Sequence, residues 1–334
     1  MLDVFKNAAF NMVSLTTAIN KTPFTPKKLG SMGLFKPKGI ATLDAAIDIR
    51  NGRISIYKTA ARGSKANGHR SASKNVRSFR IPHIPVDFEV TADEVQGVRQ
   101  FGSENKLETV SGVVAEKMKE VRENMELTFE WHRMGAIHGR VLDGDGTSVV
   151  YNWFSEFNIT ETVVDFAFTS ATEDVKQKCT DVIRHIEDAL GADVYTNIVA
   201  VCGKNFFDEL TSHPKVIDAY NRWQDSEHQR VQQGTRKGQG FTFGDITFIE
   251  YRASVGSIDF VNDDQCRFFP VGGPNLYEVF FAPANYIETV NTIGKPFYAK
   301  QKRQDFDTGI DLQAQSNPMF IPNRVASLIK GTKS

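Results

Sequence analysis

Residues 104–138 read ENKLETVSGVVAEKMKEVRENMELTFEWHRMGAIH, and this stretch predicts the longest helix of the chain. Its apolar residues recur at spacings of three and four, as on one face of an α-helix. At about 1.5 Å per residue, about 30 residues make a rod of roughly 45 Å. We therefore expect a structural spine with a single apolar stripe, formed by Leu107, Val110, Val114, Met118, Val121, Met125 and Phe129. We expect the other face to carry charges, namely Glu108, Lys117, Lys119, Glu120, Arg122, Glu123, Glu126, Glu130 and Arg133.

A strongly basic stretch precedes the spine. Residues 51–86 contain no Asp or Glu, whereas the whole chain has 40 acidic and 40 Lys or Arg residues. Asn51-Gly52 is a strong hairpin signal, so we expect residues 41–90 to form an extended β-hairpin loop, with strands at 53–57 and 78–90. Its basic residues are Arg53, Lys58, Arg62, Lys65, Arg70, Lys74, Arg77 and Arg80.

Three interpretations of this basic loop remain open. It could be a solvated loop, an arm that binds nucleic acid, or an arm that lies on an acidic face of another copy. Tyr57 and Phe79 are its aromatic residues, which is few for a surface that stacks single-stranded bases.

Residues 1–40 resemble an arm. Residues 21–39 are rich in Pro, Gly and Lys, which favours extended backbone and turns over a helix. Apolar side chains such as Leu29 and Phe35 are interspersed there. They must be buried either on a neighbouring subunit or on their own domain.

The remainder of the chain mixes helices and strands. Residues 169–190 predict an amphipathic helix with a capping box from Ser170 to Glu173 and an end at Gly191. Residues 197–202 predict a buried strand, and a helix follows from 204 to 210 and resumes to Trp223. Further strands are expected at 241–251, 257–261, 265–271, 277–282 and 324–329, with alternating polarity at 298–310.

Composition and motifs argue against an enzyme. The net charge is zero and there are three cysteines, so we expect reduced thiols, no disulfide framework, and no dedicated nucleic-acid binder. No signal peptide or membrane-spanning helix is predicted. The chain contains no Walker A, H-E-x-x-H, G-x-S-x-G or G-x-G-x-x-G sequence, and its histidines show no metal-binding spacing. Asp143-Gly-Asp-Gly146 predicts a hairpin turn, because the twelfth position of a calcium loop would be Phe154. We expect no catalytic residue, cofactor or metal.

Four segments in order resemble the lambda-type family called phage major capsid protein E, which has the HK97-like fold. They are Leu15-Thr-Thr-Ala-Ile-Asn-Lys-Thr-Pro23 with Leu34-Phe35, residues 49–56 with Ala61-Arg62-Gly63, Gly139-Arg-Val-Leu-Asp-Gly-Asp-Gly146 with Trp153-Phe-Ser-Glu-Phe157, and Asn317-Pro318 with Arg324. The family's usual Arg-Pro near the end is Arg324-Val325 here.

The resemblance implies an α+β protein with five parts. These are an N-terminal arm (1–40), an extended loop (41–90), a peripheral domain with the spine helix (91–165), an α/β axial domain (166–282) and a return to the peripheral domain (283–334). It also implies a virion protein, made in the host cytoplasm, that self-assembles as hexamers and pentamers into an icosahedral head around double-stranded DNA. A portal, a separate scaffolding protein and a decoration protein are the implied partners, without membrane contact and without an autocatalytic crosslink.

The basic loop needs a counter-surface, because a lone two-stranded hairpin is marginally stable in water. The acidic face of the spine helix is one candidate, with Glu108, Glu116, Glu120 and Glu123. The alternative function is a nucleic-acid-binding protein that uses the basic hairpin 51–86.

Overall fold

The computed structural model of the 334-residue chain divides it into two compact units. Unit 1 combines Met1–Ile47, Ser78–Arg133 and Glu278–Phe320, and unit 2 combines Asp48–Arg77, Met134–Tyr277 and Ile321–Ser334. No described helix is long and apolar enough to cross a lipid bilayer. The residues described are 11–23, 27–48, 76–95, 110–222, 224, 240–256, 258–305 and 308–333.

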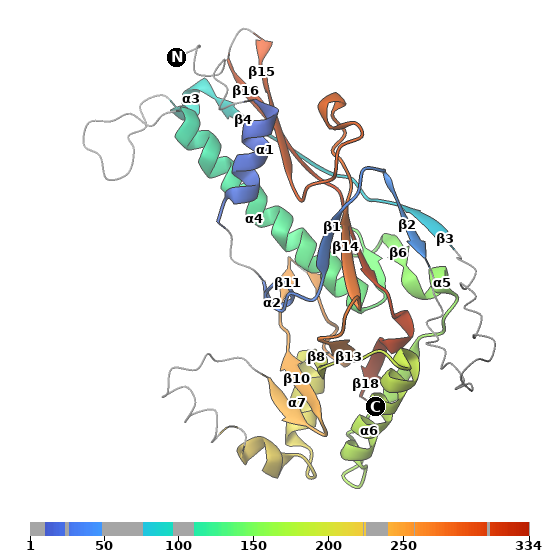
Figure 1. Ribbon diagram of the computed structural model, residues 1–334. Helices are drawn as coiled ribbons and strands as arrows, with labels where there is room; N and C mark the ends of the chain where they lie inside the picture. Colours follow the sequence, from blue (N-terminus) through green and yellow to red (C-terminus); the bar gives the residue numbers. More distant parts are fainter. Residues whose placement is uncertain are drawn as a thin grey trace, which may run out of the picture. The chain divides into compact units, whose positions relative to one another are not determined.

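The predicted spine is present as helix α4, Val110–Ile137 (Figure 1). Its 28 residues make a rod of about 42 Å. Residues 104–109 of the predicted helix lie outside the described residues. From Val114 onward the predicted apolar stripe is confirmed, because the following members are buried: Val114, Met118, Val121, Met125 and Phe129.

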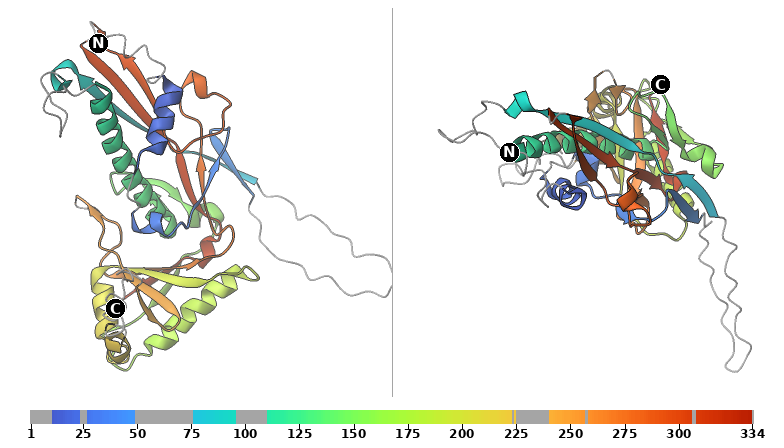
Figure 2. Two further views of the ribbon diagram at one scale, coloured as in Figure 1. Left: turned by 60° about the vertical axis from the view of Figure 1, so that its left-hand side comes forward. Right: turned by 90° about the horizontal axis from the view of Figure 1, so that it is seen from above.

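Unit 1 contains a three-stranded antiparallel sheet of β15 (Tyr298–Arg303), β16 (Gly309–Ser316) and β4 (Ile84–Thr91), with β16 in the middle. Figure 2 shows these strands side by side. Helix α1 (Met12–Lys21) packs against β15, where Ala299 N donates to Thr16 Oγ1 at 3.2 Å. Within the described residues, the arm therefore includes a helix packed on its own chain.

A second sheet joins β1 (Lys36–Gly39), β14 (Tyr277–Phe281) and β17 (Pro318–Pro322), with β1 parallel to β14. Gly39 sits where a side chain has no room. A Cβ atom there would collide with the carbonyl oxygen of Gly294 and approach Ile293 Cγ2 at 2.6 Å. This contact fastens the arm to the loop that follows β14.

Two expectations for the arm and the extended loop need correction. Residues 21–39 are not purely extended, because α2 (Lys28–Ser31) forms there and buries Leu29 on its own chain. The single strand expected at 78–90 is two strands. β3 (Val76–Arg80) pairs with β2 (Asp44–Asp48), and β4 pairs with β16. Pro82 lies in the break, where its missing N–H cannot continue a ladder. The expected strand 53–57 lies outside the described residues.

Unit 2 is built on a six-stranded mixed sheet. Its strand β8 (Asn197–Cys202) has the predicted bounds and runs parallel to β10 and antiparallel to β13. Every residue of β8 after Asn197 is buried, as a continuous apolar strand predicts. The order is β7 (Thr162–Asp165), β18 (Ile329–Thr332), β13 (Gln265–Val271), β8, β10 (Ile246–Glu250) and β9 (Phe241–Phe243).

An aromatic core joins this sheet to helices α6 (Val175–Leu190) and α7 (Lys204–Ser212). Phe268 of β13 stacks on Phe166, with ring centroids 5.6 Å apart. Phe206 of α7 meets Phe166 edge-on at 5.4 Å. These large buried rings pack against one another in the interior of unit 2. The predicted helix at 204–210 is confirmed, and its helical continuation resumes after Pro214.

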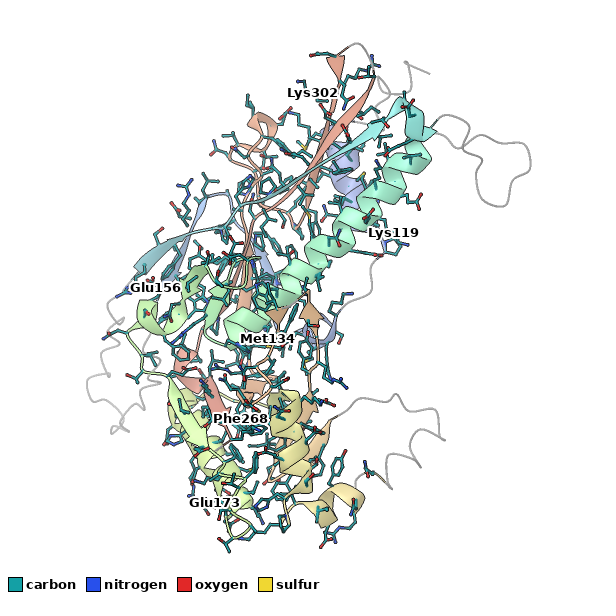
Figure 3. All side chains as sticks on the ribbon, turned by 180° about the vertical axis from the view of Figure 1, so that it is seen from behind. Lys119, Met134, Glu156, Glu173, Phe268 and Lys302 are labelled. Carbon is teal, nitrogen blue, oxygen red and sulfur yellow. The ribbon has the colours of Figure 1, made fainter. Side chains whose placement is uncertain are left out.

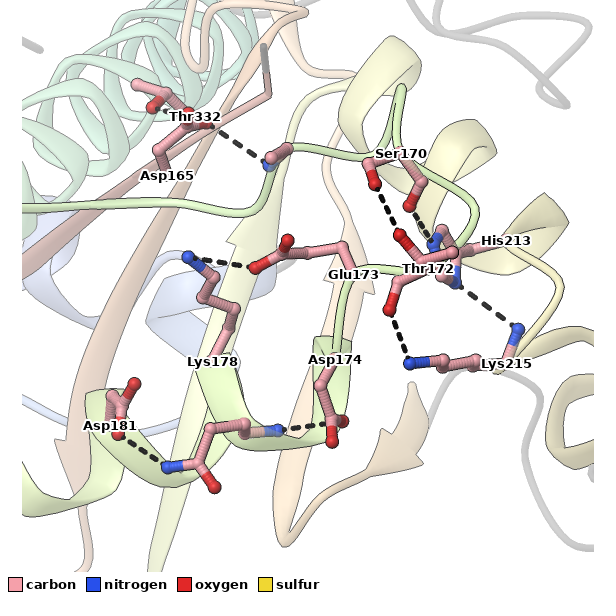
Figure 4. A network of polar contacts seen from close by, with 12 residues as sticks. Asp165, Ser170, Thr172, Glu173, Asp174, Lys178, Asp181, His213, Lys215 and Thr332 are labelled. Carbon is pink, nitrogen blue, oxygen red and sulfur yellow. Dashed lines mark hydrogen bonds and ion pairs between the residues drawn. The ribbon is translucent and has the colours of Figure 1, made fainter.

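The predicted capping box of the helix at 169–190 is wrong. α6 begins at Val175, and Asp174 caps it by accepting a hydrogen bond from Gln177 N at 3.2 Å. The Ser170 hydroxyl instead lies 3.0 Å from the Thr172 hydroxyl, and Glu173 pairs with Lys178 (Figure 4). The start shifts because the local turns before Asp174 take up the polar side chains. Gly191 ends the helix as predicted, with φ +64°.

The Asp143-Gly-Asp-Gly146 segment forms the predicted turn between β5 (Arg140–Leu142) and β6 (Val149–Asn152). Asp145 Oδ1 accepts hydrogen bonds from the backbone N–H of Thr147 and of Ser148, both at 2.8 Å. Hydrogen bonds, first of all from the Ser148 hydroxyl, lower the pKa of Asp145 to about 2. The Asp145 carboxylate therefore stabilises the turn. Helix α5 (Trp153–Phe157) follows.

Two late expectations also change. The strand predicted at 241–251 is the hairpin of β9 and β10, because Gly244 and Asp245 adopt positive φ between them. The closing strand predicted at 324–329 is a 3₁₀ turn, Val325–Ser327, followed by β18. The short strands β11 (Ser254–Val255) and β12 (Ile258–Asp259) form a separate ladder. Helix α3 (Ala92–Val95) follows β4 in unit 1.

Candidate assembly surfaces

Three exposed carboxylates form a row on α4, which we call the acidic ladder: Glu116, Glu120 and Glu123. Their spacings of four and three place them on one face of the helix. Lys119, labelled in Figure 3, is exposed on the same helix. Within the described part of the chain no ion pair involves the ladder, whereas the adjacent Lys117 is engaged with Glu94 at 2.6 Å. Glu108, the fourth predicted member, lies outside the described residues.

Other charges of α4 lie inside unit 1, contrary to the expectation that they form an outer charged face. Arg122, Glu126 and Glu130 are buried, and Arg133 is half-buried. Their positions, 122, 126, 130 and 133, continue one stripe along the helix. That stripe faces the arm, and we call these four residues the arm-binding network.

Glu130 anchors helix α2 of the arm. Its two carboxylate oxygens accept hydrogen bonds from Leu29 N at 2.6 Å and from Gly30 N at 3.0 Å. Arg133 lies 3.3 Å from the same carboxylate. The first N–H groups of a helix have no partner within the helix, so Glu130 satisfies two of them from another element. Gly30 permits this approach, because a Cβ there would lie 3.1 Å from Arg133 Nη1.

Arg122 anchors helix α1. Its Nη1 donates to the carbonyl oxygen of Ile19, and its guanidinium lies 4.8 Å from the ring centroid of Phe297. Glu126 lies between Arg122 and Arg133, 3.7 Å from each. Burial raises the pKa of Glu126, although both arginines oppose the shift. Burial lowers the pKa of Arg122.

Aromatic rings enclose this network. Phe129 stacks on Phe297 with ring centroids 5.1 Å apart. The guanidinium of Arg133 lies 5.4 Å from the ring centroid of Phe320. Low local polarity strengthens each charged contact and makes an unpaired charge expensive. The network therefore fixes the arm to the spine helix of the same chain.

Sequence reasoning missed the arm-binding network because a charge on an amphipathic helix is ordinarily solvated. A signal was present in the spacing. Glu126 and Glu130 both lie on one side of Phe129 around the helix, beside the apolar stripe. What they bind could not be read from local sequence, because Leu29 and Gly30 are 101 and 100 residues away from Glu130.

Most of the predicted basic contact residues lie outside the described residues: Arg53, Lys58, Arg62, Lys65, Arg70 and Lys74. Arg77 is described and is engaged within its own unit. Its Nη1 donates to the carbonyl oxygen of Glu156, and its guanidinium lies 3.9 Å from the Glu156 carboxylate. Both side chains are about half exposed, so this pair adds little stability.

The three cysteines are buried free thiols. Cys202 and Cys266 lie opposite each other on β8 and β13, with sulfurs 3.1 Å apart. Burial raises the pKa of Cys266, and it raises the pKa of Cys179 to about 12. Among the described residues no group of His, Cys, Asp or Glu is arranged to hold a metal ion.

Comparison with known proteins shows the family to which this chain belongs. The model of the family described as phage major capsid protein E matches residues 11–333. The chain belongs to this family. The major capsid protein of Salmonella phage Felix O1 is 28% identical over 348 residues, covering 95% of this chain and 94% of the relative. The major capsid protein of Pseudomonas phage KPP10 is 28% identical over 287 residues, covering 81% of this chain and 82% of the relative.

A solved structure supports the fold. A prophage protein of Escherichia coli CFT073, assigned as its capsid protein, matches with a TM-score of 0.57 at 15% identity, covering 97% of this chain and 99% of that one. The fold is HK97-like, as the sequence resemblance implied. The chain is a structural subunit of a phage capsid, and it self-assembles into the shell of the virion. The comparisons give no support to the alternative nucleic-acid-binding function.

Proposed function

We propose that the basic segment 51–86 of one copy lies on the acidic ladder of a neighbouring copy and clamps the two together. The observation that carries this proposal is the row of Glu116, Glu120 and Glu123, exposed and without an ion pair in the described part of the chain. Like charges at these spacings destabilise a helix by a few tenths of a kcal/mol per pair. A cationic partner reverses the sign of that contribution.

The basic segment has the complementary charge. It contains eight Lys or Arg and no Asp or Glu, in a chain with zero net charge. Each copy therefore carries both halves of the contact. Such a heterologous contact closes into a ring when the rotation between copies allows it. We propose that the copies form pentamers and hexamers, and rings of five or six subunits require a heterologous contact.

The charge of the ladder disfavours DNA as its partner, because phosphates and carboxylates repel. Packaged DNA would instead meet other parts of the shell interior without sequence specificity. We further propose that a portal, a separate scaffolding protein and, for mature heads, a decoration protein complete the particle. Assembly would take place in the host cytoplasm. We propose no covalent crosslink between copies, so in denaturing gels of mature particles this chain should run as one band without high-mass ladders.

A charge-reversal series tests the clamp. Arg62→Glu with Arg70→Glu should leave folded, soluble subunits but lower the yield of shells, counted in electron micrographs. Glu116→Lys with Glu120→Lys should do the same. Combining the two pairs in one chain should restore shells, because the attraction returns with opposite polarity.

Arg252→Glu is the matched control, because this exposed arginine pairs only with Glu250 among the described residues, at 3.6 Å. It should leave the shell yield unchanged. Normal shells from the Arg62 and Arg70 variant would disprove the clamp. Failure of the combined variant to recover would place the basic segment on another surface.

A further inference from the structure

Three of the ten most exposed large hydrophobic side chains in the described residues fall within seven residues. They are Ile287, Val290 and Ile293, with 91%, 64% and 69% of their surface exposed. They belong to the segment 284–294 between β14 and β15 in unit 1, which we call the apolar loop. Scattered exposed aliphatic residues need no explanation, but a cluster marks a contact surface.

The apolar loop is held firmly in its own chain. Thr289 Oγ1 donates to the carbonyl oxygen of Ala284 at 2.6 Å. Asn285 N donates to Gln315 Oε1 at 2.8 Å, and Gly294 N donates to the carbonyl oxygen of Ile40 at 2.9 Å. These bonds anchor both ends and the middle. The loop is therefore ordered in advance, and a partner would not have to immobilise it.

The apolar loop carries almost no free charge. Its single charged residue is Glu288, which pairs with Lys300 at 2.7 Å. A contact between identical loops of different copies brings like residues together, so unpaired charges would repel one another. Neutral aliphatic side chains with one internally paired carboxylate suit such a contact.

The neighbouring groove is a poorer place for an aliphatic side chain. It opens on the sheet of β4, β15 and β16 and is lined in part by charged residues, Asp87, Glu89, Lys302 and Asp311. Inserting an isoleucine of another copy there would remove water from these charges without providing new partners. The aliphatic side chains of the apolar loop are therefore better buried against the same loop of another copy than in this groove.

We propose that apolar loops of neighbouring copies meet one another in the assembled shell. The contact is small. Three aliphatic side chains cover a few hundred Å² at most, whereas a stable interface buries about 800 Å² per partner. The loops therefore join subunits only when other contacts already hold the copies in place. The proposal rests on self-assembly of the chain and does not require the clamp by segment 51–86.

A pair of opposite charges tests the contact between like loops. Full chains carrying Ile287→Glu or Ile287→Lys are each expressed with the phage's other head proteins, and particles are counted by electron microscopy. Each variant alone should lower the yield of shells by about tenfold or more, through lost burial and like-charge repulsion. Co-expression of the two variants should raise the yield well above either alone, because opposite charges then meet.

Ile287→Val is the control, since it keeps an aliphatic side chain at the same position and should assemble normally. Thermal unfolding of the free subunits should be the same for all three variants. Normal shells from either charged variant would overturn the proposal. Impaired shells without recovery on co-expression would also overturn it, because the loop would then contact a different surface. In the clamp test, the variant of segment 51–86 is rescued by reversed charges on the acidic ladder and not by a change in the apolar loop. The two proposals can therefore fail independently.

Discussion

Glu130 does more than its position on an amphipathic helix suggests. It is a buried carboxylate that binds two backbone N–H groups of the arm and the guanidinium of Arg133. A charge in such a place stabilises the fold only while all of its partners remain. The arm and the spine helix are therefore coupled through one side chain.

Replacing Glu130 by Ala should destabilise the subunit by about 3–5 kcal/mol, because Leu29 N, Gly30 N and Arg133 lose their acceptor. Chemical denaturation of the purified subunit measures this free energy. Glu123→Ala, on the exposed face of the same helix, should change it by no more than about 0.5 kcal/mol. Equal effects of the two variants would contradict the arm-binding network.

Asp145 contributes to the stability of the fold, and this contribution depends on pH. Its pKa is about 2, below the ordinary value of 3.8, chiefly through the hydrogen bond from the Ser148 hydroxyl. A lowered pKa means that the stabilising contribution is present above the ordinary pKa and is lost as the pH falls from about 4 towards 2. Titration of the carboxyl carbon by NMR should give a midpoint near 2. Ser148→Ala should raise the midpoint, and an unchanged midpoint in that variant would refute the assignment of the cause.

At the scale of elements, tight turns with positive φ set where strands and helices stop. Gly139 follows α4 with φ +72°, and a Cβ there would collide with the ring of Phe154. Gly191 ends α6 with φ +64°, but nothing lies within 4 Å of the place where a Cβ would be. Both glycines have positive φ, and they differ in packing.

This difference predicts unequal costs for the same substitution. Gly191→Ala should cost about 1–3 kcal/mol, from the positive-φ backbone alone. Gly139→Ala should cost about 1–3 kcal/mol more, because the added methyl group displaces a buried ring. Thermal unfolding of both variants measures the difference. Equal losses would mean that Phe154 moves aside without cost.

At the scale of the whole molecule, two surfaces of different chemistry are proposed to join copies. The clamp between segment 51–86 and the acidic ladder is electrostatic and exposed, whereas the contact of the apolar loops is hydrophobic. At 1 M salt the Debye length is about 3 Å, so exposed charges that are farther apart are largely screened. Salt leaves the burial of aliphatic side chains largely intact. The two contacts should therefore respond differently to ionic strength.

Shell yield should accordingly fall as sodium chloride is raised during assembly, measured as the fraction of protein that sediments as particles. In the combined variant with both clamp charges reversed, the same dependence should hold. The Ile287→Val variant should follow the unmodified chain at every salt concentration. A yield that does not change with salt would contradict a mainly electrostatic clamp.

Local sequence determined several elements of this protein. The period of three to four at positions 114–129 specified α4 and its buried stripe. The apolar run 197–202 specified β8, and Asp143-Gly-Asp-Gly146 specified a turn. These patterns act through neighbours one or two turns away, so they can be read without knowledge of the fold. The ordered set of short motifs also identified the capsid family.

Only the tertiary structure decided which charges of α4 face inward. Glu123 and Glu130 lie on one helix and have the same chemistry, yet one is exposed and the other is buried against Leu29 and Gly30. The break between β3 and β4 likewise depends on distant partners, β2 and β16. A periodic pattern states that a helix or strand has two sides. The partner that covers each side comes from remote parts of the chain, and burial by that partner sets whether a charge is solvated or structural.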